Sequence, residues 1–156
     1  MNNPMGTNEA GDNAYVFDFS DQTILIAEDI DFSYLYIEAV LRRTGAKVLW
    51  AQNGKEAVDF VKSNPKIDLV LMDMYMPVMD GYDATRLITE LRPELPVIAQ
   101  TAFVLPADVK RCFTAGCSGF LAKPIRKEQL LNTLDEFINK LKQQNSGLQI
   151  GKVSNG

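Results

Sequence analysis

The chain has 156 residues, of which 46% are hydrophobic, so it is long enough for one domain with a sizeable core. Twenty acidic and 16 basic residues leave a net charge of −4, which argues against a nucleic-acid-binding surface. No apolar run approaches the roughly 20 residues of a membrane-spanning helix, and residues 1–13 lack the apolar part of a secretory signal. We therefore expect a cytoplasmic chain without membrane contact, and the absence of histidine excludes histidine-based catalysis and histidine metal ligands.

Residues 1–21 precede the expected domain. Residues 1–13 are polar and rich in Asn and Gly, which is typical of a mobile linker or of residues added for expression. Tyr15, Phe17 and Phe19 follow, and aromatic residues so close together indicate either docking on the domain or a linker from a preceding domain. We expect the domain itself over residues 22–142 and a disordered tail over residues 143–156.

Five short apolar segments alternate with five periodic segments along the domain. The apolar segments are typical of strands buried on both faces, and they span residues 23–27, 47–51, 69–72, 96–100 and 118–122. The periodic segments predict helices at residues 32–44, from the Asn53–Gly54 turn to residue 63, and at residues 83–91, 106–115 and 127–142. Strict alternation predicts a parallel sheet with helices on both faces and right-handed crossovers.

Apolar spacing predicts the buried faces of the first and last helices. In the first helix, one stripe is formed by Tyr36, Ile37, Val40 and Leu41. In the last helix, the stripe comprises Leu130, Leu131, Leu134, Phe137, Ile138 and Leu141. Near the end of the fourth helix, we interpret Cys112 and Cys117 as buried, reduced thiols rather than redox sensors or a disulfide.

Polar residues directly follow four of the five predicted strands. Glu28 and Asp29 follow the first strand, Asp73 the third, Thr101 the fourth and Lys123 the fifth. Because parallel strands end at the same edge of a sheet, where ligands of such sheets bind, we expect these side chains to lie close together. Asp73 alone could equally cap the turn that follows it, but four placements at one edge favour a chemical role.

Three carboxylates in one place repel one another, so this cluster implies a bound cation. Oxygen ligands without thiolate or imidazole favour a hard ion, Mg²⁺ by default and Mn²⁺ as the alternative. Lys123 adds a positive charge opposite the cation, and Thr101 offers a hydroxyl donor. A group with several anionic oxygens, such as a phosphoryl group, would fit between them.

In order and spacing, four segments resemble the receiver domain of two-component response regulators: residues 24–29, 72–81, 99–102 and 121–125. The resemblance covers residues 22–142, most of the chain. It implies an α/β, flavodoxin-like fold in which a doubly wound sheet has five parallel strands in the order 2-1-3-4-5. It also implies a phosphoacceptor that labels itself with the help of Mg²⁺, rather than a conventional enzyme.

The same resemblance implies a role for each residue of the cluster. Asp73 would be the phosphoacceptor, taking a phosphoryl group from a phosphohistidine on a histidine kinase or a histidine phosphotransfer domain. The cation ligands would be Glu28, Asp29, Asp73 and the backbone carbonyl of Tyr75. Lys123 would pair with Asp73 and then with its phosphoryl group.

Two further residues would link the site to a surface. Thr101 would move to grip the phosphoryl group, and Phe120 would swing inward behind it. This would remodel the face made by the fourth helix, the fifth strand and the fifth helix. Phe120 stands where the family often has tyrosine, so the switch lacks a hydroxyl hydrogen bond. The Lys123–Pro124 peptide bond is expected to be cis, as in the family.

Tyr75 and Phe103 flank the expected phosphoryl group in the family pattern. Both side chains are bulky, and they could hinder an attacking water and so slow dephosphorylation. The alternative is that they only pack or face solvent. The sequence leaves both interpretations open.

Three alternative functions fit the residues less well. A phosphatase of the haloacid dehalogenase type also uses a strand-end Asp, Mg²⁺ and a Lys, but it needs a second acid where this chain has Tyr75. A flavodoxin-like electron carrier needs a first loop rich in Ser, Thr and Gly, whereas residues 27–31 are acidic. A degenerate receiver used only for docking would lack site residues that are all present here.

The origin of the chain has two interpretations. Residues 15–21 resemble the linker that follows a kinase ATP-binding domain, and residues 76–86 and 121–125 resemble hybrid-kinase receivers. The chain also stops after its fifth helix, so we favour the receiver module of a hybrid histidine kinase, in the cytoplasmic portion of a membrane-bound sensor. The alternative is a stand-alone single-domain regulator. In either case we expect a monomer or weak dimer.

Overall fold

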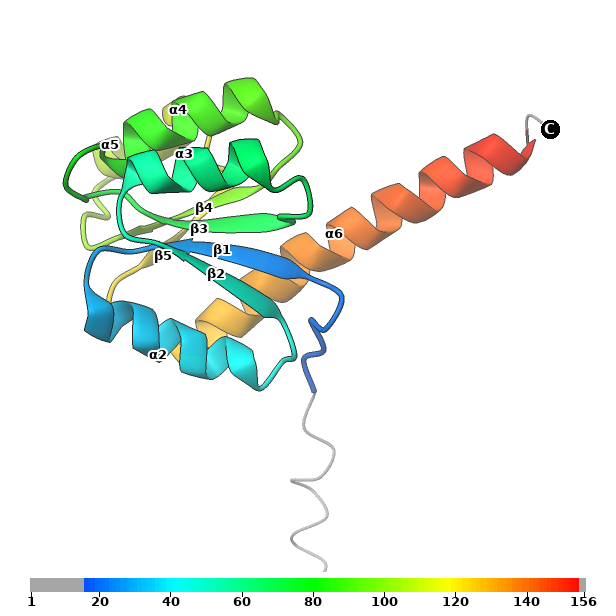
Figure 1. Cartoon of the computed structure of the whole chain (residues 1–156), viewed down its shortest axis with the longest axis horizontal. Coiled ribbons are helices and arrows are strands. Elements are labelled where there is room, and N and C mark those ends of the chain that lie inside the picture. Colours follow the sequence, from blue (N-terminus) through cyan, green and yellow to red (C-terminus); the bar gives the residue numbers. More distant parts are fainter. Residues whose placement is uncertain (1–15, 155–156) are drawn as a thin grey trace, which may run out of the picture.

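The computed structural model describes residues 16–154, with side-chain surroundings through residue 147. Its strands are β1 (Thr23–Ala27), β2 (Lys47–Ala51), β3 (Leu69–Asp73), β4 (Val97–Thr101) and β5 (Gly119–Ala122). They alternate with α2 (Asp31–Arg42), α3 (Gly54–Ser63), α4 (Gly81–Leu91), α5 (Pro106–Ala115) and α6 (Lys127–Ser154). The strands form one parallel sheet in the order β2-β1-β3-β4-β5, which confirms the predicted doubly wound fold (Figure 1).

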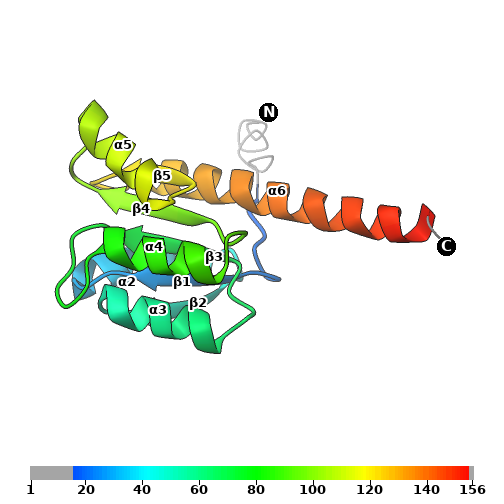
Figure 2. The same ribbon diagram turned by 90° about the horizontal axis from the view of Figure 1, so that it is seen from above.

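Helices cover both faces of the sheet, as the alternation predicted. Helices α2 and α6 pack on one face, and α3, α4 and α5 on the other (Figures 1 and 2). Within β3, Val70 and Met72 point toward α3 and α4, whereas Leu69 and Leu71 belong to the opposite core. Burial on both faces explains why β3 reads as a continuous apolar run rather than as an alternating one.

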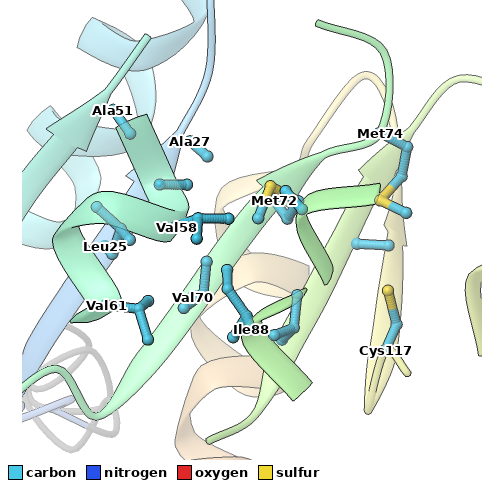
Figure 3. Packing of buried hydrophobic residues seen from close by; sticks show 14 of the residues in the cluster. Leu25, Ala27, Ala51, Val58, Val61, Val70, Met72, Met74, Ile88 and Cys117 are labelled. Carbon is cyan, nitrogen blue, oxygen red and sulfur yellow. The ribbon is translucent and has the colours of Figure 1, made fainter. Parts of the chain in front are cut away.

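The core on the α3–α5 side is built from small and medium-sized side chains. Figure 3 shows Val58 and Val61 of α3 and Ile88 of α4 lying against Val70 and Met72 of the sheet. Each side chain of this size stabilises the fold by about 1.5–3 kcal/mol when fully buried. The two cysteines, Cys112 and Cys117, are buried and free, as predicted.

Strand register aligns the carboxyl edge of the sheet. Ala27 at the end of β1 lies opposite Met72, and Asp73 lies opposite Gln100. Thr101 at the end of β4 lies opposite Ala122 at the end of β5. The residues that follow these positions therefore leave the sheet at the same level, which brings the predicted site residues to one edge.

Two aromatic residues before β1 dock on the domain. Phe19 is buried beside α2 and α6, and Phe17 packs against the same core with its ring centroid 6.0 Å from that of Phe19. The backbone N–H of Phe19 donates to the carbonyl of Thr44 at 2.8 Å. The predictions for residues 1–13 and for Tyr15 lie outside the described residues.

The buried face of α2 is narrower than the spacing of its apolar residues predicted. Ile37, Val40 and Leu41 of α2 are buried, but Tyr36 is 41% exposed. Its assignment to the buried stripe was wrong, because Tyr36 lies at the border of the stripe, beside the exposed face of the helix.

Helix α6 is longer than predicted. The polar composition after residue 142 predicted a tail, but the helix continues to Ser154 and extends beyond the sheet (Figure 1). Its first half is anchored by buried Leu130, Leu131, Leu134 and Ile138. Once packing has nucleated a helix, each further residue adds a hydrogen bond at little cost, so polar residues can continue it. Within the described part of the chain, no helix has the length and hydropathy needed to cross a bilayer.

Candidate functional site

Three carboxylates converge at the carboxyl edge of the sheet. Glu28 and Asp29 follow the last residue of β1, and Asp73 is the last residue of β3. One oxygen from each of these side chains lies within 4.8 Å of the others. Glu28 is fully buried and Asp73 is 5% exposed, so water can screen their mutual repulsion only weakly.

Lys123 supplies the positive charge of the cluster. It follows β5, and its backbone N–H donates to the carbonyl of Thr101 at 2.8 Å. Its Nζ lies 3.0 Å from Oε2 of Glu28 and 3.1 Å from Oδ2 of Asp73. The Lys123–Pro124 peptide bond is cis, as the resemblance implied. One ammonium therefore bridges two of the three carboxylates.

Burial and neighbouring charges shift the pKa values of this group. Burial, followed by the charge of Asp73, raises the pKa of Glu28 to about 7, although Lys123 opposes the shift. Burial lowers the pKa of Lys123, but the charge of Asp73 and the hydrogen bond and charge of Glu28 outweigh it, so the net shift is upward. Lys123 thus stays protonated at neutral pH, while Glu28 is poised between its two forms.

The donor set fits a hard divalent cation. Oδ1 of Asp29 is buried and has no hydrogen-bond partner among the described residues, so it is free to bind a ligand. Three carboxylates face one ammonium, which leaves the cluster with an excess of negative charge when all are ionised. Carboxylate oxygens are the ligands that Mg²⁺ and Mn²⁺ prefer. The predicted metal ligands Glu28, Asp29 and Asp73 are therefore brought together.

Backbone donors hold two of the carboxylates in place. The N–H of Ile30 donates to Oε1 of Glu28 at 3.2 Å, and the N–H of Tyr75 donates to Oδ1 of Asp73 at 3.0 Å. Gly81, the first residue of α4, lies so close to Asp73 that an added Cβ would be 2.3 Å from the Asp73 carbonyl oxygen. Only glycine lets α4 begin directly beside the end of β3.

The two predicted switch residues, Thr101 and Phe120, make their contacts outside this cluster. Thr101 is 1% exposed, and its hydroxyl accepts from the N–H of Phe103 at 3.0 Å, within its own loop. Phe120 is half-buried and meets Phe113 edge-on, with ring centroids 6.4 Å apart. Their roles as phosphoryl grip and switch remain predictions.

Tyr75 and Phe103 meet at the edge of the site. Their ring centroids lie 4.8 Å apart, although Tyr75 follows β3 and Phe103 follows β4. Tyr75 also meets the buried ring of Tyr82 edge-on at 5.9 Å. The two loops that flank Asp73 are therefore joined by aromatic contact.

Sequence reasoning missed two residues near the cluster. Trp50 was assigned only to the second strand, yet its indole N–H donates to the backbone carbonyl of Glu28 at 2.8 Å. Gln100 is buried beside Asp73 in the sheet, and neither polar atom of its side chain has a partner among the described residues. The only signals in the sequence that could have indicated them were a large residue, Trp50, in the second strand and a polar residue, Gln100, in the apolar fourth strand.

Comparison with known proteins places the chain in a family. Residues 24–135 match the response regulator receiver domain. The chain is 40% identical over 117 residues to the two-component response regulator ORR41 of Oryza sativa subsp. japonica, covering 73% of this chain and 92% of that protein. It is 31% identical over 138 residues to histidine kinase 3 of Arabidopsis thaliana, covering 74% of this chain but only 13% of the kinase.

A solved complex gives a structural match. The structure resembles one chain of a solved complex between the Saccharomyces cerevisiae histidine phosphotransfer protein Ypd1 and the receiver domain of its downstream response regulator Ssk1. The TM-score is 0.74 at 25% sequence identity, and the alignment covers 79% of this chain and 91% of the matched one.

Proposed function

Because this chain belongs to the response regulator receiver domain family, we propose that Asp73 accepts a phosphoryl group from a phosphohistidine of a partner protein. The single observation that carries the proposal is a buried carboxylate at the end of the central strand β3, paired with Lys123 and set beside two further carboxylates. Family membership also decides against the phosphatase and electron-carrier alternatives.

In the proposed reaction, an oxygen of Asp73 attacks phosphorus, and the bond from phosphorus to the histidine nitrogen breaks with its electron pair left on the ring. Glu28, Asp29, Asp73 and the carbonyl of Tyr75 would hold Mg²⁺, which neutralises charge on the phosphoryl oxygens. Phosphorylation converts the Asp73 carboxylate into an acyl phosphate and so removes its charge, which lets Lys123 turn its ammonium from that carboxylate to a phosphoryl oxygen.

Labelling with a small phosphodonor tests this assignment. Acetyl phosphate and Mg²⁺ should add one phosphoryl group to the protein, detected by intact mass. The Asp73→Asn variant removes the nucleophilic oxygen with almost no change of shape, so it should stay unlabelled. Equal labelling of that variant would contradict the assignment of Asp73.

A switch on the surface made by α5, β5 and α6 completes the proposed function. Thr101 ends β4, and its hydroxyl accepts from the N–H of Phe103 at 3.0 Å and donates to the carbonyl of Phe103 at 3.5 Å, a long hydrogen bond between neutral groups. A phosphoryl oxygen offers that hydroxyl a stronger, charged acceptor. A beryllofluoride complex, which mimics the phosphoryl group, should shift backbone amide resonances over residues 102–123. Shifts limited to the loops around Asp73 would argue against a transmitted switch.

The exposed side of α2 is our proposed docking surface for the phosphodonor. Phe32, Leu35 and Tyr36 are exposed there, at helical spacing and next to the acidic cluster. A monomer gains no stability from exposing three large apolar side chains together, so these residues indicate a surface that binds a partner. Charged side chains in their place would make a weaker contact with that partner. The matched yeast receiver binds a histidine phosphotransfer protein, so a partner of that kind is our proposal for this chain.

A substitution on α2 separates docking from chemistry. Phe32→Ser should slow phosphotransfer from a phosphorylated histidine phosphotransfer protein but leave labelling by acetyl phosphate unchanged, because the small donor needs no docking surface. Equal loss with both donors would place the defect in the site instead.

We favour the receiver of a hybrid histidine kinase as the origin of the chain. Residues 76–86 and 121–125 support it, and the receiver-like match to the Arabidopsis kinase occupies only a small part of that longer protein. The 40% identity to a rice response regulator that the chain covers almost completely supports the stand-alone alternative. The sequence of the native gene distinguishes the two origins. A reading frame that begins near Met1, with no kinase upstream, would overturn the hybrid assignment.

A further inference from the structure

Trp50 contacts the acidic loop without belonging to the acidic cluster. It is the chain's single tryptophan, and it lies on the edge strand β2, in register with Ile26. Its indole N–H donates to the backbone carbonyl of Glu28 at 2.8 Å. The paired residues of β1 and β2 end at Ala27 and Ala51, so this carbonyl lies one residue beyond them and is bound by a side chain.

This bond acts on the loop that joins β1 to α2. Helix α2 begins after Ile30, whose side chain cannot cap the helix, so the usual hydrogen bond from an N-cap side chain is missing. The backbone N–H of Glu28 donates to the carbonyl of Ala51 at 2.9 Å. With the indole bond, both the N–H and the C=O of Glu28 are therefore tied to β2.

Fixing the Glu28 carbonyl also fixes the residue that follows it. The peptide group between Glu28 and Asp29 is planar, so the direction of the carbonyl sets the direction in which the chain leaves toward Asp29. The side chain of Asp29 has no hydrogen bond at its buried Oδ1 to orient it independently. The approach of Asp29 to Glu28 and Asp73 thus depends on the backbone that carries it.

Tyr34 holds the indole in place from the other side of the loop. Its ring stacks on Trp50 with centroids 4.1 Å apart and planes 5° from parallel. Tyr34 belongs to the first turns of α2, and its backbone N–H donates to the carbonyl of Ile30 at 3.0 Å. Trp50 therefore contacts both ends of the segment that carries the two acidic residues.

From this geometry we propose that Trp50 is a positioning residue for the cation site. Its N–H holds the Glu28 carbonyl so that the carboxylates of Glu28 and Asp29 already converge on Asp73 before a cation binds. Preorganisation of this kind raises affinity because binding need not order the loop. The inference rests on the proposed function, in which these carboxylates bind Mg²⁺.

A sulfur analogue of tryptophan tests the N–H itself. Benzothienylalanine keeps the shape and the stacking surface of the indole but replaces the N–H with sulfur. Because the chain has a single tryptophan, growth of a tryptophan auxotroph on the analogue changes only residue 50. We expect the Mg²⁺ dissociation constant, measured by calorimetry on the full chain, to rise roughly three- to tenfold, the size of one hydrogen bond.

Labelling kinetics give a second readout that a merely structural role would not move. The Mg²⁺ concentration for half-maximal labelling by acetyl phosphate should rise by the same factor, whereas the rate at saturating Mg²⁺ should match wild type. Val48→Ala is the matched control, since Val48 lies two residues earlier on the same strand, opposite Ile24 and away from the loop. It should lower the melting temperature and leave the Mg²⁺ dissociation constant unchanged.

Two results would overturn the inference in distinguishable ways. A dissociation constant for the analogue within twofold of wild type would show that the N–H does not position the site. A wild-type chain that binds no Mg²⁺ at millimolar concentration would instead remove the cation ligands from the proposed function, and this inference with them.

Discussion

Burial and charge conflict at Glu28. It is fully buried, and its two carboxylate oxygens accept hydrogen bonds from the N–H of Ile30 and from Lys123. These bonds favour the charged form, but burial and the neighbouring charge of Asp73 outweigh them and raise the pKa of Glu28 to about 7. Without a cation, the folded site therefore disfavours the ionised form of Glu28 relative to a glutamate in water.

This shift predicts the pH dependence of stability in the absence of a cation. The pKa of Glu28 is about 7 in the folded protein and 4.5 ordinarily, so the folded state binds the proton more tightly. The contribution is complete below pH 4.5 and is lost as pH rises through about 7. Glu28 should thus lower the free energy of unfolding by on the order of 3 kcal/mol across this range. Urea denaturation at several pH values, with a chelator present, measures it.

The Glu28→Gln variant is the control for that pH profile. Glutamine keeps the shape of the side chain but cannot titrate, so the decline in stability between pH 5 and 8 should be much smaller than in wild type. The prediction fails if the variant and the wild type show the same slope. Added Mg²⁺ should restore stability to the wild type above pH 7, because it binds only the folded state.

At the scale of elements, the loop between β3 and α4 contains a strained turn. The N–H of Met79 donates to the carbonyl of Pro77 at 2.7 Å, which closes a three-residue turn around Val78. Val78 has a φ of 68°, a region that β-branched residues rarely adopt. Its side chain is 79% exposed, so little burial offsets this strain.

Replacing Val78 with glycine should therefore stabilise the protein. Backbone strain of this kind costs about 1–3 kcal/mol, and the greater freedom of glycine in the unfolded chain offsets part of the gain. We expect Val78→Gly to raise the free energy of unfolding by about 1 kcal/mol, measured by urea denaturation. Val78→Ala keeps a Cβ at the same φ and should gain less. A glycine variant no more stable than the alanine variant would show that the turn is not strained.

The contact between Tyr75 and Phe103 joins two loops. Its effect on the lifetime of phosphorylated Asp73 can be tested. The rings lie 4.8 Å apart, and one of the two interpretations left open by the sequence is that they hinder the approach of a water that attacks the phosphoryl group. Phe103→Ala should open that approach and shorten the lifetime of phosphorylated Asp73 several-fold, followed by intact mass after removal of the donor. Val104→Ala, in the same exposed loop, should not change it. An unchanged lifetime in Phe103→Ala would support the alternative that the two rings only pack.

At the scale of the whole molecule, α6 has two parts with different roles. Its first part packs against the sheet through Leu130, Leu131, Leu134 and Ile138, whereas residues 142–147 are exposed. Figure 2 shows the helix continuing past the sheet edge. The stability of the domain should therefore depend on the first part alone.

A chain that ends at Lys142 tests this division and the predicted domain boundary. We expect its melting temperature to stay within about 2 °C of the full chain, with less helical signal in circular dichroism. A chain that ends at Asp135 is the matched control, because it loses buried Ile138 and should melt at a much lower temperature or fail to fold. A fall of more than about 5 °C on ending at Lys142 would show that the outer half of α6 supports the domain.

The sequence by itself determined the order of strands and helices along the chain and the polar residues at the strand ends. Both follow from local patterns: apolar runs and helical spacing place the elements, and parallel strands bring their carboxyl ends to one edge. Asp73, Lys123, Glu28 and Asp29 could therefore be expected together, and the structure places them together.

Only the tertiary structure decided which residues support that site and how far its elements extend. The indole of Trp50 reaches the carbonyl of Glu28 across 22 residues of sequence, and no pattern within β2 encodes that reach. Helix α6 continues to Ser154 because its packed first half has already nucleated it. In each case the deciding contact comes from a distant part of the chain, so local spacing could not predict it.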